Sequence, residues 1–336
     1  MIKFAKKKRG ICLEKSLEFD AQEAQRLDTF LADKLSQTRS QTAQLIKKGA
    51  VSIDGKQTHK PGLKLKGTEK VAVELPEARQ SEPMDVDFDV EVLFEDEDIL
   101  VLNKPSGVTV HSAPSVKEAT LVDWLKKRGV RLSTISGEER HGIVHRLDKG
   151  TSGVMVVAKT NEAHSALASQ LEDKSMGRYY LAVLTPPLKE ELSVVERPIA
   201  RNPSNRIKMA CVEGGKEAKT AFLQLTYSND EKEQLVACKL FSGRTHQIRV
   251  HLESISRHIV GDTVYAANIG KASAEHILLH AYILYLRHPI TGKAMQFVAP
   301  YDEVFESYLR KKFEMEKVNE TTQPEYIVRK FDTASF

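Results

Sequence analysis

The spacing of apolar residues in the first quarter of the chain predicts a small mixed domain. Leucines and a phenylalanine recur at helical intervals across residues 27–35, and a second helical run covers residues 40–49. A short strand pattern follows at residues 51–53, and the Asp54-Gly55 pair after it is typical of a tight hairpin. We therefore expect a compact α/β unit over residues 21–82.

Farther along, the pattern predicts a larger domain built on strands. Residues 99–102 form a continuous apolar run, as in a buried strand. Residues 220–227 alternate between apolar and polar side chains, and residues 235–241 provide a partner strand. For residues 83–312 we expect an α+β fold with a mixed, largely antiparallel sheet and flanking helices.

Helices and a further strand lie between these segments. Thr120 and Asn161 stand at the start of helical patterns, where their side chains can cap free backbone amides. In the strand 178–183, alternation places Tyr180 on the face opposite Tyr179. The two tyrosines are therefore expected to have different neighbours.

The two ends of the sequence lack a strong apolar period. Residues 1–20 contain the run Lys6-Lys7-Lys8-Arg9, which either aids solubility or reaches a nucleic acid, and we expect a basic N-terminal tail. Residues 313–336 are charged, and we expect a frayed helix or a disordered C-terminal tail.

The composition is that of a globular chain. Of the 336 residues, 41% are hydrophobic and 29% are charged, and no apolar run approaches the length of a membrane span. The basic start is not followed by the apolar core of a signal peptide, so we expect a cytoplasmic protein. A monomer is the default expectation for the oligomeric state.

Charge is unevenly distributed along the chain. The net charge is +4, yet residues 1–80 carry 17 Lys and Arg against 10 Asp and Glu, whereas residues 81–100 carry nine acids and no base. The basic N-terminal quarter is therefore the better candidate for a surface that contacts phosphates.

Neither cysteines nor histidines indicate a metal site. Cys12, Cys211 and Cys238 are widely spaced, without the pairs typical of a disulfide framework or a zinc site. His141 and His145 have helical spacing, but a glycine lies between them and no carboxylate or cysteine accompanies them. We expect no metal.

The residues best suited to chemistry lie in the segment 142–158. Its middle reads His-Arg-Leu-Asp-Lys-Gly-Thr-Ser-Gly, a poor helix interior, and the apolar residues after it form a good buried strand. Charged loops held by strands often carry function. Taken alone, Asp148 could still be a turn residue that binds nearby backbone amides.

This segment resembles the RluA-type family of RNA pseudouridine synthases. The likeness extends from about residue 21 to residue 300, and includes Lys104-Pro105-Ser106-Gly107, Arg178-Tyr179-Tyr180 and Gly243-Arg244-Thr245-His246-Gln247-Ile248-Arg249. Members commonly have Gly-His-Pro and a later glycine where this chain has Arg257-His258 and Ala266. These departures affect a loop and no expected catalytic group.

The resemblance implies which residues act. The family's catalytic aspartate corresponds to Asp148, the arginine that pairs with it to Arg244, and the tyrosine that lines the uracil pocket to Tyr180. Arg146 is expected to fill the space that a flipped base leaves, or to contact phosphate. The other side chains expected at the substrate are His145, Lys104, His246 and Arg249.

Residues 21–82 resemble the S4 RNA-binding domain. The matching segments are Arg26-Leu27-Asp28, Thr38-Arg39-Ser40 and Lys47-Lys48-Gly49. The expected RNA-binding residues are Arg26, Arg39, Ser40, Lys47 and Lys48. Cations on one side of the helix pair would suit the phosphates of folded RNA, although a solvated helical face is the alternative.

The implied reaction breaks the N1–C1′ bond of uridine and rejoins the base through C5. No atoms or electrons are gained or lost, so we expect no cofactor. A guanidinium beside the Asp148 carboxylate would favour its charged form. That carboxylate could add to C1′ or C6, or remove the C2′ proton. Tyr180 would support the base and assist loss of the C5 proton.

Several alternatives remain open on the sequence. The runs Pro198-Ile199-Ala200-Arg201 and Gly215-Lys216-x-Ala218 resemble D-type members, which act on large-subunit (23S) ribosomal RNA, while a C-type paralogue with other target uridines is the runner-up. A non-catalytic RNA-binding or ribosome-assembly protein on the same fold is the alternative from another class. Because Asp148 and Arg244 are both present, the enzyme is favoured.

Overall fold

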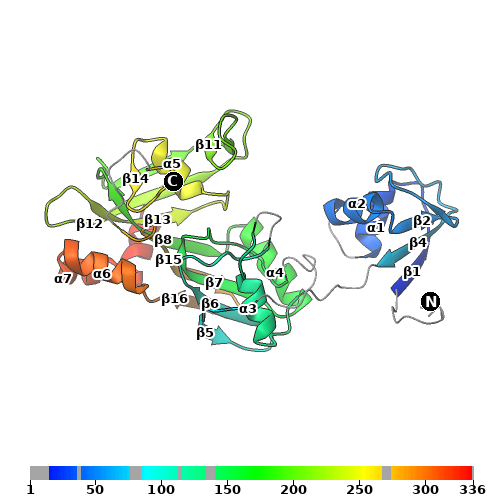
Figure 1. Ribbon diagram of the computed structural model, residues 1–336, viewed down its shortest axis with the longest axis horizontal. Coiled ribbons are helices and arrows are strands. Elements are labelled where there is room, and N and C mark those ends of the chain that lie inside the picture. Colours follow the sequence, from blue (N-terminus) through cyan, green and yellow to red (C-terminus); the bar gives the residue numbers. More distant parts are fainter. Residues whose placement is uncertain are drawn as a thin grey trace. The chain divides into compact units, whose positions relative to one another are not determined.

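The computed structural model describes residues 15–35, 39–75, 85–112, 116–133, 141–266 and 274–334. These residues form two compact units, a small N-terminal one and a large one that contains most of the chain from residue 85 onward (Figure 1). The basic run expected at residues 6–9 lies outside the described residues.

The N-terminal unit has the expected helix pair and hairpin beside a small sheet. Its elements are β1 (Lys15–Asp20), α1 (Leu27–Lys34), α2 (Arg39–Lys47), β2 (Val51–Ile53), β3 (Lys56–Gln57) and β4 (Lys70–Leu75), with strand order β1-β4-β2-β3. Asp54 and Gly55 have φ of 48° and 77°, as a tight two-residue turn requires. The expected tail boundary at residue 20 is wrong, because residues 15–20 pair with β4.

The large unit contains a mixed sheet, in which ten strands are described. The path is β5-β6-β7-β15-β8-β13-β12-β9, with β14 paired to β8 and β16 to β15. The pairing of β7 with β15 is parallel and the others are antiparallel. The elements are β5 (Glu91–Glu95), β6 (Ile99–Lys104), α3 (Leu121–Lys127), β7 (Ser152–Ala158), α4 (Asn161–Glu172), β8 (Gly177–Thr185), β9 (Leu192–Glu196), β10 (Ile199–Arg201), β11 (Met209–Cys211), β12 (Lys219–Tyr227), β13 (Gln234–Leu240), α5 (Gln247–Glu253), β14 (His258–Ile259), β15 (Leu279–Arg287), β16 (Ala294–Val298), α6 (Glu303–Lys312), α7 (Met315–Thr321) and α8 (Pro324–Asp332).

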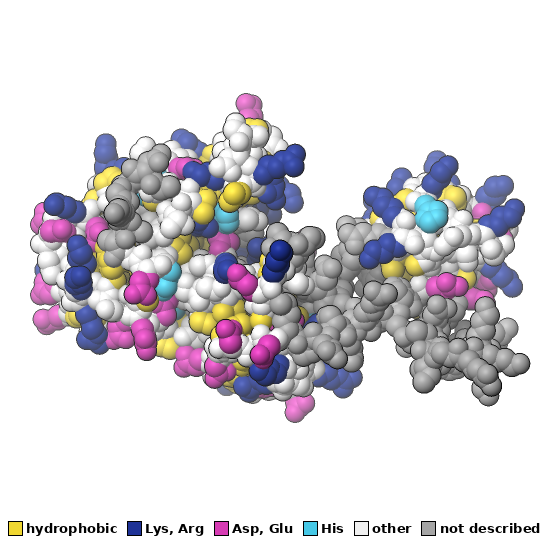
Figure 2. Space-filling view, in the orientation of Figure 1, with side chains coloured by type: hydrophobic (Ala, Val, Ile, Leu, Met, Phe, Trp, Pro, Cys, Tyr) yellow, Lys and Arg dark blue, Asp and Glu magenta, His cyan; other side chains and the backbone are white. Residues whose placement is uncertain are grey.

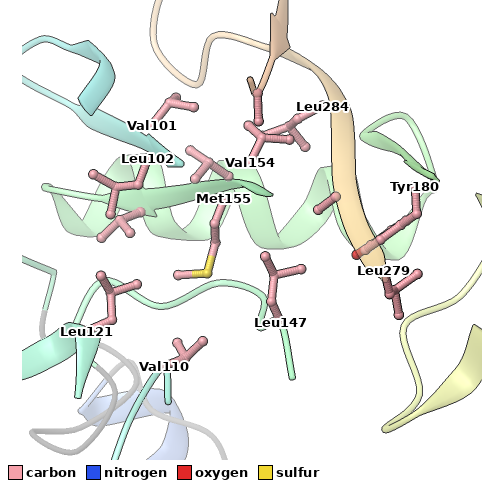
Figure 3. Packing of buried hydrophobic residues seen from close by; sticks show 14 of the residues in the cluster. Val101, Leu102, Val110, Leu121, Leu147, Val154, Met155, Tyr180, Leu279 and Leu284 are labelled. Carbon is pink, nitrogen blue, oxygen red and sulfur yellow. The ribbon is translucent and has the colours of Figure 1, made fainter. Parts of the chain in front are cut away.

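Strand β8 contributes to two apolar cores, one on each side. Tyr180, Ala182 and Leu184 belong to one core, while Tyr179 and its alternating neighbours belong to the other. The predicted alternation is therefore confirmed. Figure 3 shows Tyr180 and Leu147 among the side chains of the first core.

Side chains that cap free backbone amides mark where helices α3 and α4 begin. Thr120 caps α3 as expected, in a capping box with Asp123. For α4 the cap is Thr160, whose hydroxyl accepts from the Ala163 amide, rather than Asn161, which is the first helical residue. A hydroxyl preceding the first turn satisfies an amide that the helix itself leaves free.

The expected disordered C-terminal tail is wrong. Residues 315–321 and 324–332 form α7 and α8, which bury Val318, Ile327 and Phe331 at 0% exposure in the second core. The ring of Phe331 stacks on Tyr179 with 5.5 Å between centroids. These helices are thus part of the folded domain. Among the described helices, none has the length and apolar character needed to cross a membrane.

Candidate active site

The loop that carries Asp148 is anchored by its neighbours in the sequence. Leu147 is buried at 4% exposure, whereas Arg146 before it is exposed and Asp148 after it is half-buried. Farther along, Gly153 has a φ of 112°, and a Cβ there would stand 2.1 Å from the Ala281 carbonyl oxygen. Only glycine permits this approach of β7 to β15, which fixes the end of the loop.

Lys104 is a brace beneath the loop rather than a substrate contact, which corrects its expected role. Its side chain has 0% exposure, and its Nζ donates to the carbonyls of Pro105 (2.8 Å), Val108 (2.9 Å) and Lys149 (3.3 Å). Burial lowers the pKa of Lys104 to about 7, although Asp148 and Asp302 act in the opposite direction. The Gly107 amide also donates to the Lys149 carbonyl, at 2.8 Å.

Asp148 stands at the wall of a cavity of about 310 Å³. The charged and polar residues that line it come from the Asp148 loop, from β8 and from the segment before and within α5: His145, Arg146, Asp148, Thr151, Arg178, Tyr180, Arg244, Thr245, His246, Gln247 and Arg249. Asp148 retains 19% of its side-chain exposure. A ligand in the cavity can therefore reach the carboxylate.

The arginine against Asp148 is Arg249, not the expected Arg244. Arg249 Nη1 donates to Asp148 Oδ2 at 3.3 Å. Arg244 lines the cavity, but its Nε donates to the Glu217 carbonyl at 3.0 Å. The difference arises because helix α5 starts after His246, so that Arg249 lies within its first turn and Arg244 precedes it.

Arg249 is itself held in place by a buried acid. Its Nε and Nη2 donate to Asp262 Oδ2 and Oδ1, both at 2.8 Å, and the Asp262 side chain has 0% exposure. Burial alone would raise the pKa of Asp262, but the bonds from Arg249 and from the amides of Tyr265 and Val264 lower it. The Arg249 guanidinium also lies over the Tyr265 ring, 4.9 Å from its centroid.

His246 completes the group around Asp148. Its Nε2 lies 3.9 Å from Asp148 Oδ2, and its Nδ1 is 2.9 Å from the Tyr265 hydroxyl. It has a left-handed φ of 57°, which costs about 1–2 kcal/mol for a non-glycine residue. Burial lowers the pKa of His246, with Arg249 acting in the same direction and Asp148 opposing it. The imidazole is therefore neutral near pH 7.

His145 lies in the cavity wall with one ring nitrogen buried and without a hydrogen-bond partner among the described residues. The Val156 amide donates to its Nε2 at 3.1 Å, so the ring proton belongs on Nδ1, which has no partner within the described residues. Burial lowers the pKa of His145 to about 3, with a smaller contribution from Arg178. The ring is neutral and lines the cavity.

Tyr180 lies in the cavity wall at 5% exposure. Burial raises the pKa of its phenol, and Asp148 acts in the same direction, whereas Arg178 opposes them. The hydroxyl therefore keeps its proton at neutral pH. The ring belongs to the apolar core as well as to the wall, so its position is fixed by packing.

In the N-terminal unit, two of the expected RNA-binding residues share a buried acid. Arg26 donates to both Asp28 oxygens (3.0 and 2.8 Å), and Arg39 donates to Asp28 Oδ2 at 3.1 Å. Lys47 and Lys48 are exposed at the end of α2. Figure 2 shows Lys and Arg side chains gathered on this unit. The side chain of Ser40 lies outside the described part of the structure.

Sequence reasoning missed three residues of the site. Arg178 lines the cavity two residues before Tyr180, and Asp262 and Tyr265 hold Arg249 and His246. The strand alternation that places Tyr180 also places Arg178 on the same face, so that signal was available. The roles of Asp262 and Tyr265 depend on contacts between distant segments.

A possible metal cluster within the described residues is accounted for by hydrogen bonds. Asp96, Asp98 and His288 bring potential ligand atoms within 4.8 Å of one another. His288 Nδ1 accepts from the Ile290 and Thr291 amides, so its Nε2 donates to Asp96 Oδ2 at 2.8 Å. The other Asp96 oxygen accepts from the amides of Asp98 and Ile99. These hydrogen bonds join the turn at residues 96–99 to the turn at residues 288–291.

Comparison with known proteins identifies the class. Residues 98–254 match the model of the RNA pseudouridylate synthase family, and residues 25–71 match that of the S4 domain. A Helicobacter pylori protein described as an uncharacterized RNA pseudouridine synthase is 44% identical over 314 residues, which is 91% of this chain and 95% of the relative. The chain therefore belongs to the RNA pseudouridine synthase family and carries an N-terminal S4 domain.

More specific relatives and a solved structure agree with this. The ribosomal large subunit pseudouridine synthase D of Zymomonas mobilis is 40% identical, over 82% of this chain and 89% of that protein. The structure of human RNA pseudouridylate synthase domain containing 1 covers 75% of this chain and 98% of its own, with a TM-score of 0.58 and 21% identity. That likeness supports the predicted fold.

Proposed function

We propose that this pseudouridine synthase modifies uridines of large-subunit ribosomal RNA, with Asp148 as the reacting carboxylate. The observation that carries the assignment of Asp148 is its position, 3.3 Å from the Arg249 guanidinium at the wall of a cavity and 19% exposed. The choice of RNA rests on relatives that are described as ribosomal large subunit pseudouridine synthases D.

The target uridine leaves its stack and enters the cavity, at a cost of about a few kcal/mol. Arg146, which is exposed at the cavity mouth, fills the space left in the RNA or contacts its backbone. Tyr180 supports the uracil ring, and His145 forms part of the cavity wall beside it. The S4 domain binds the surrounding folded RNA through phosphate contacts.

The chemistry begins with the Asp148 anion. It adds to C1′ or C6, or takes the C2′ proton, and each route releases N1 from C1′ so that the base can turn. Once C5 has joined C1′, a proton leaves C5 and N1 gains one. Arg249 positions the carboxylate throughout, and Arg244, tied to the Glu217 carbonyl, contacts the RNA at the rim.

The test is a map of pseudouridine in the large-subunit ribosomal RNA of a deletion strain. We expect specific sites to lose the modification, to regain it with the wild-type gene, and to remain unmodified with Asp148→Asn. Restoration by Asp148→Asn would overturn the role of the carboxylate. An unchanged map in the deletion strain would overturn the choice of RNA, and sites known for a C-type enzyme would point to the paralogue.

A further inference from the structure

Arg178 is a cavity residue with unused donors. It lies in β8 on the same face as Tyr180 and is half-buried in the cavity wall. Its Nε is buried and makes no hydrogen bond within the described residues. The residue as a whole is partly exposed, so a ligand in the cavity meets the Nη side of the guanidinium rather than Nε.

Gly243 provides the space that Arg178 occupies. A Cβ at Gly243 would stand 3.0 Å from Arg178 Nη1, 3.5 Å from Nη2 and 3.7 Å from Cζ. The Nη side of the guanidinium therefore lies against this glycine. Gly243 does not have a positive φ, and the three atoms nearest to a Cβ there all belong to Arg178, so the arginine is the first group that a substitution would displace.

The charges in the cavity wall select the kind of ligand. Four guanidinium groups line it, whereas the one carboxylate among the described lining residues, Asp148, is bound to Arg249. No described ion pair neutralises Arg178. A base carbonyl is a neutral acceptor, whereas a phosphate supplies both the missing charge and the oxygens that a guanidinium can bind in pairs.

We propose that Arg178 binds a phosphate of the flipped nucleotide and that Gly243 is required to hold it in position. This inference rests on the proposed function, since it concerns the same cavity and an RNA substrate. Arg178 acts as a binding residue and Tyr180, on the same strand face, meets the base of the same nucleotide. A substrate held at both points is fixed relative to Asp148.

The first test compares Arg178→Met with wild type on an RNA stem-loop that contains a mapped uridine. We expect the Kd and KM to rise about 10- to 100-fold, as for loss of one charge-assisted hydrogen bond, with little change in kcat. The slope of log Kd against log salt should fall by about 0.7 to 0.9, the contribution of one phosphate. The charge-matched control is Arg310→Met, an exposed arginine paired with Glu306.

The second test moves Arg178 without removing its charge. Gly243→Ala should raise KM, and the bulkier Gly243→Val should raise it more. Neither substitution should raise KM further when it is added to Arg178→Met. A methylphosphonate at one linkage beside the target uridine should weaken binding to wild type and leave binding to Arg178→Met unchanged.

The outcomes separate this inference from the proposed function. If wild type modifies the RNA but Arg178→Met keeps the wild-type salt slope and the same sensitivity to methylphosphonate, Arg178 does not bind phosphate. If Gly243→Val and Arg178→Met add their effects, Gly243 does not act through Arg178. Loss of kcat with unchanged KM would also overturn the assignment. Failure of wild type to modify ribosomal RNA would reject the proposed substrate instead.

Discussion

Asp262 holds Arg249 through two hydrogen bonds of 2.8 Å, and its own side chain is fully buried. Because both Nε and Nη2 of the arginine are engaged, its plane is fixed and Nη1 is left to meet Asp148 at 3.3 Å. The proposed reacting carboxylate is thus positioned through Arg249 by a buried acid that is not among the residues lining the cavity.

The first prediction separates the two arginines of the α5 segment. Arg249→Lys should lower kcat about 100-fold or more, because an ammonium cannot bind Asp262 in the bidentate manner and reach Asp148 as well. Arg244→Lys should raise KM and leave kcat nearly unchanged, since its Nε binds the Glu217 carbonyl. Single-turnover kinetics check this, and the reverse pattern would restore Arg244 as the partner of Asp148.

The second prediction concerns how the stability contributed by Asp262 depends on pH. Asp262→Asn removes one partner of a buried ion pair and should cost about 3 kcal/mol or more of unfolding free energy near pH 7. The pKa of Asp262 is lowered in the folded protein, so its contribution is present above the ordinary value of about 3.9 and is lost as pH falls below it. Urea unfolding should show the two proteins converging in stability toward low pH. A difference in unfolding free energy that stays constant as the pH falls would contradict this role of Asp262.

Local rules explain which parts of the site could be predicted. Strand alternation separates Tyr180 from Tyr179, the family resemblance assigns Tyr180 to the cavity, and the glycines and hydroxyls after Asp148 indicate a loop held by a strand. The partner of Asp148 could not be found in the same way. Its identity depends on where α5 begins, and there His246 adopts a left-handed conformation beside Tyr265, a residue 19 positions away.

Burial against distant segments accounts for the other errors. Lys104 is expected from the family resemblance to contact the substrate, but one of its acceptors is the Lys149 carbonyl, 45 residues farther along the chain. The charge of the C-terminal residues predicts a tail, although Ile327 and Phe331 have the i,i+4 spacing of one helix face. That spacing was visible, but what the face packs on was not.

The third prediction concerns the buried lysine. Lys104→Met removes the Nζ donor from the Pro105 and Val108 carbonyls, while the Lys149 carbonyl keeps the Gly107 amide, and should destabilise the protein by about 1–3 kcal/mol for each acceptor left unpaired. Lys104 has a folded pKa of about 7 and an unfolded value near 10.4, so wild type gains stability from this group as pH rises between them.

The difference in unfolding free energy between wild type and Lys104→Met should therefore widen from pH 7 to pH 9, by up to about 1.4 kcal/mol per pH unit. Chemical denaturation at several pH values measures it. The control is Lys189→Met, which removes an exposed lysine and should show no such trend. A difference that stays constant from pH 7 to pH 9 would mean that Lys104 keeps its charge in the folded protein.

The fourth prediction tests whether the C-terminal helices are part of the core. Phe331→Ala should cost about 3–5 kcal/mol, because the ring is fully buried and stacks on Tyr179. Arg329→Ala, an exposed change on the same helix, should stay within about 0.5 kcal/mol of wild type. Thermal unfolding distinguishes them, and equal melting temperatures would restore the tail interpretation.

The fifth prediction separates binding from stability in the S4 domain. Replacing both Lys47 and Lys48 with Gln should weaken RNA binding and lower its salt slope by about 0.7 to 0.9 for each phosphate that is no longer bound, without loss of stability, because both side chains are exposed. Arg26→Gln should also destabilise the domain, since it breaks the bidentate pair that compensates the buried Asp28. Filter binding and urea unfolding measure the two effects. Full RNA affinity in the double Lys variant would show that this end of α2 is an ordinary solvated face.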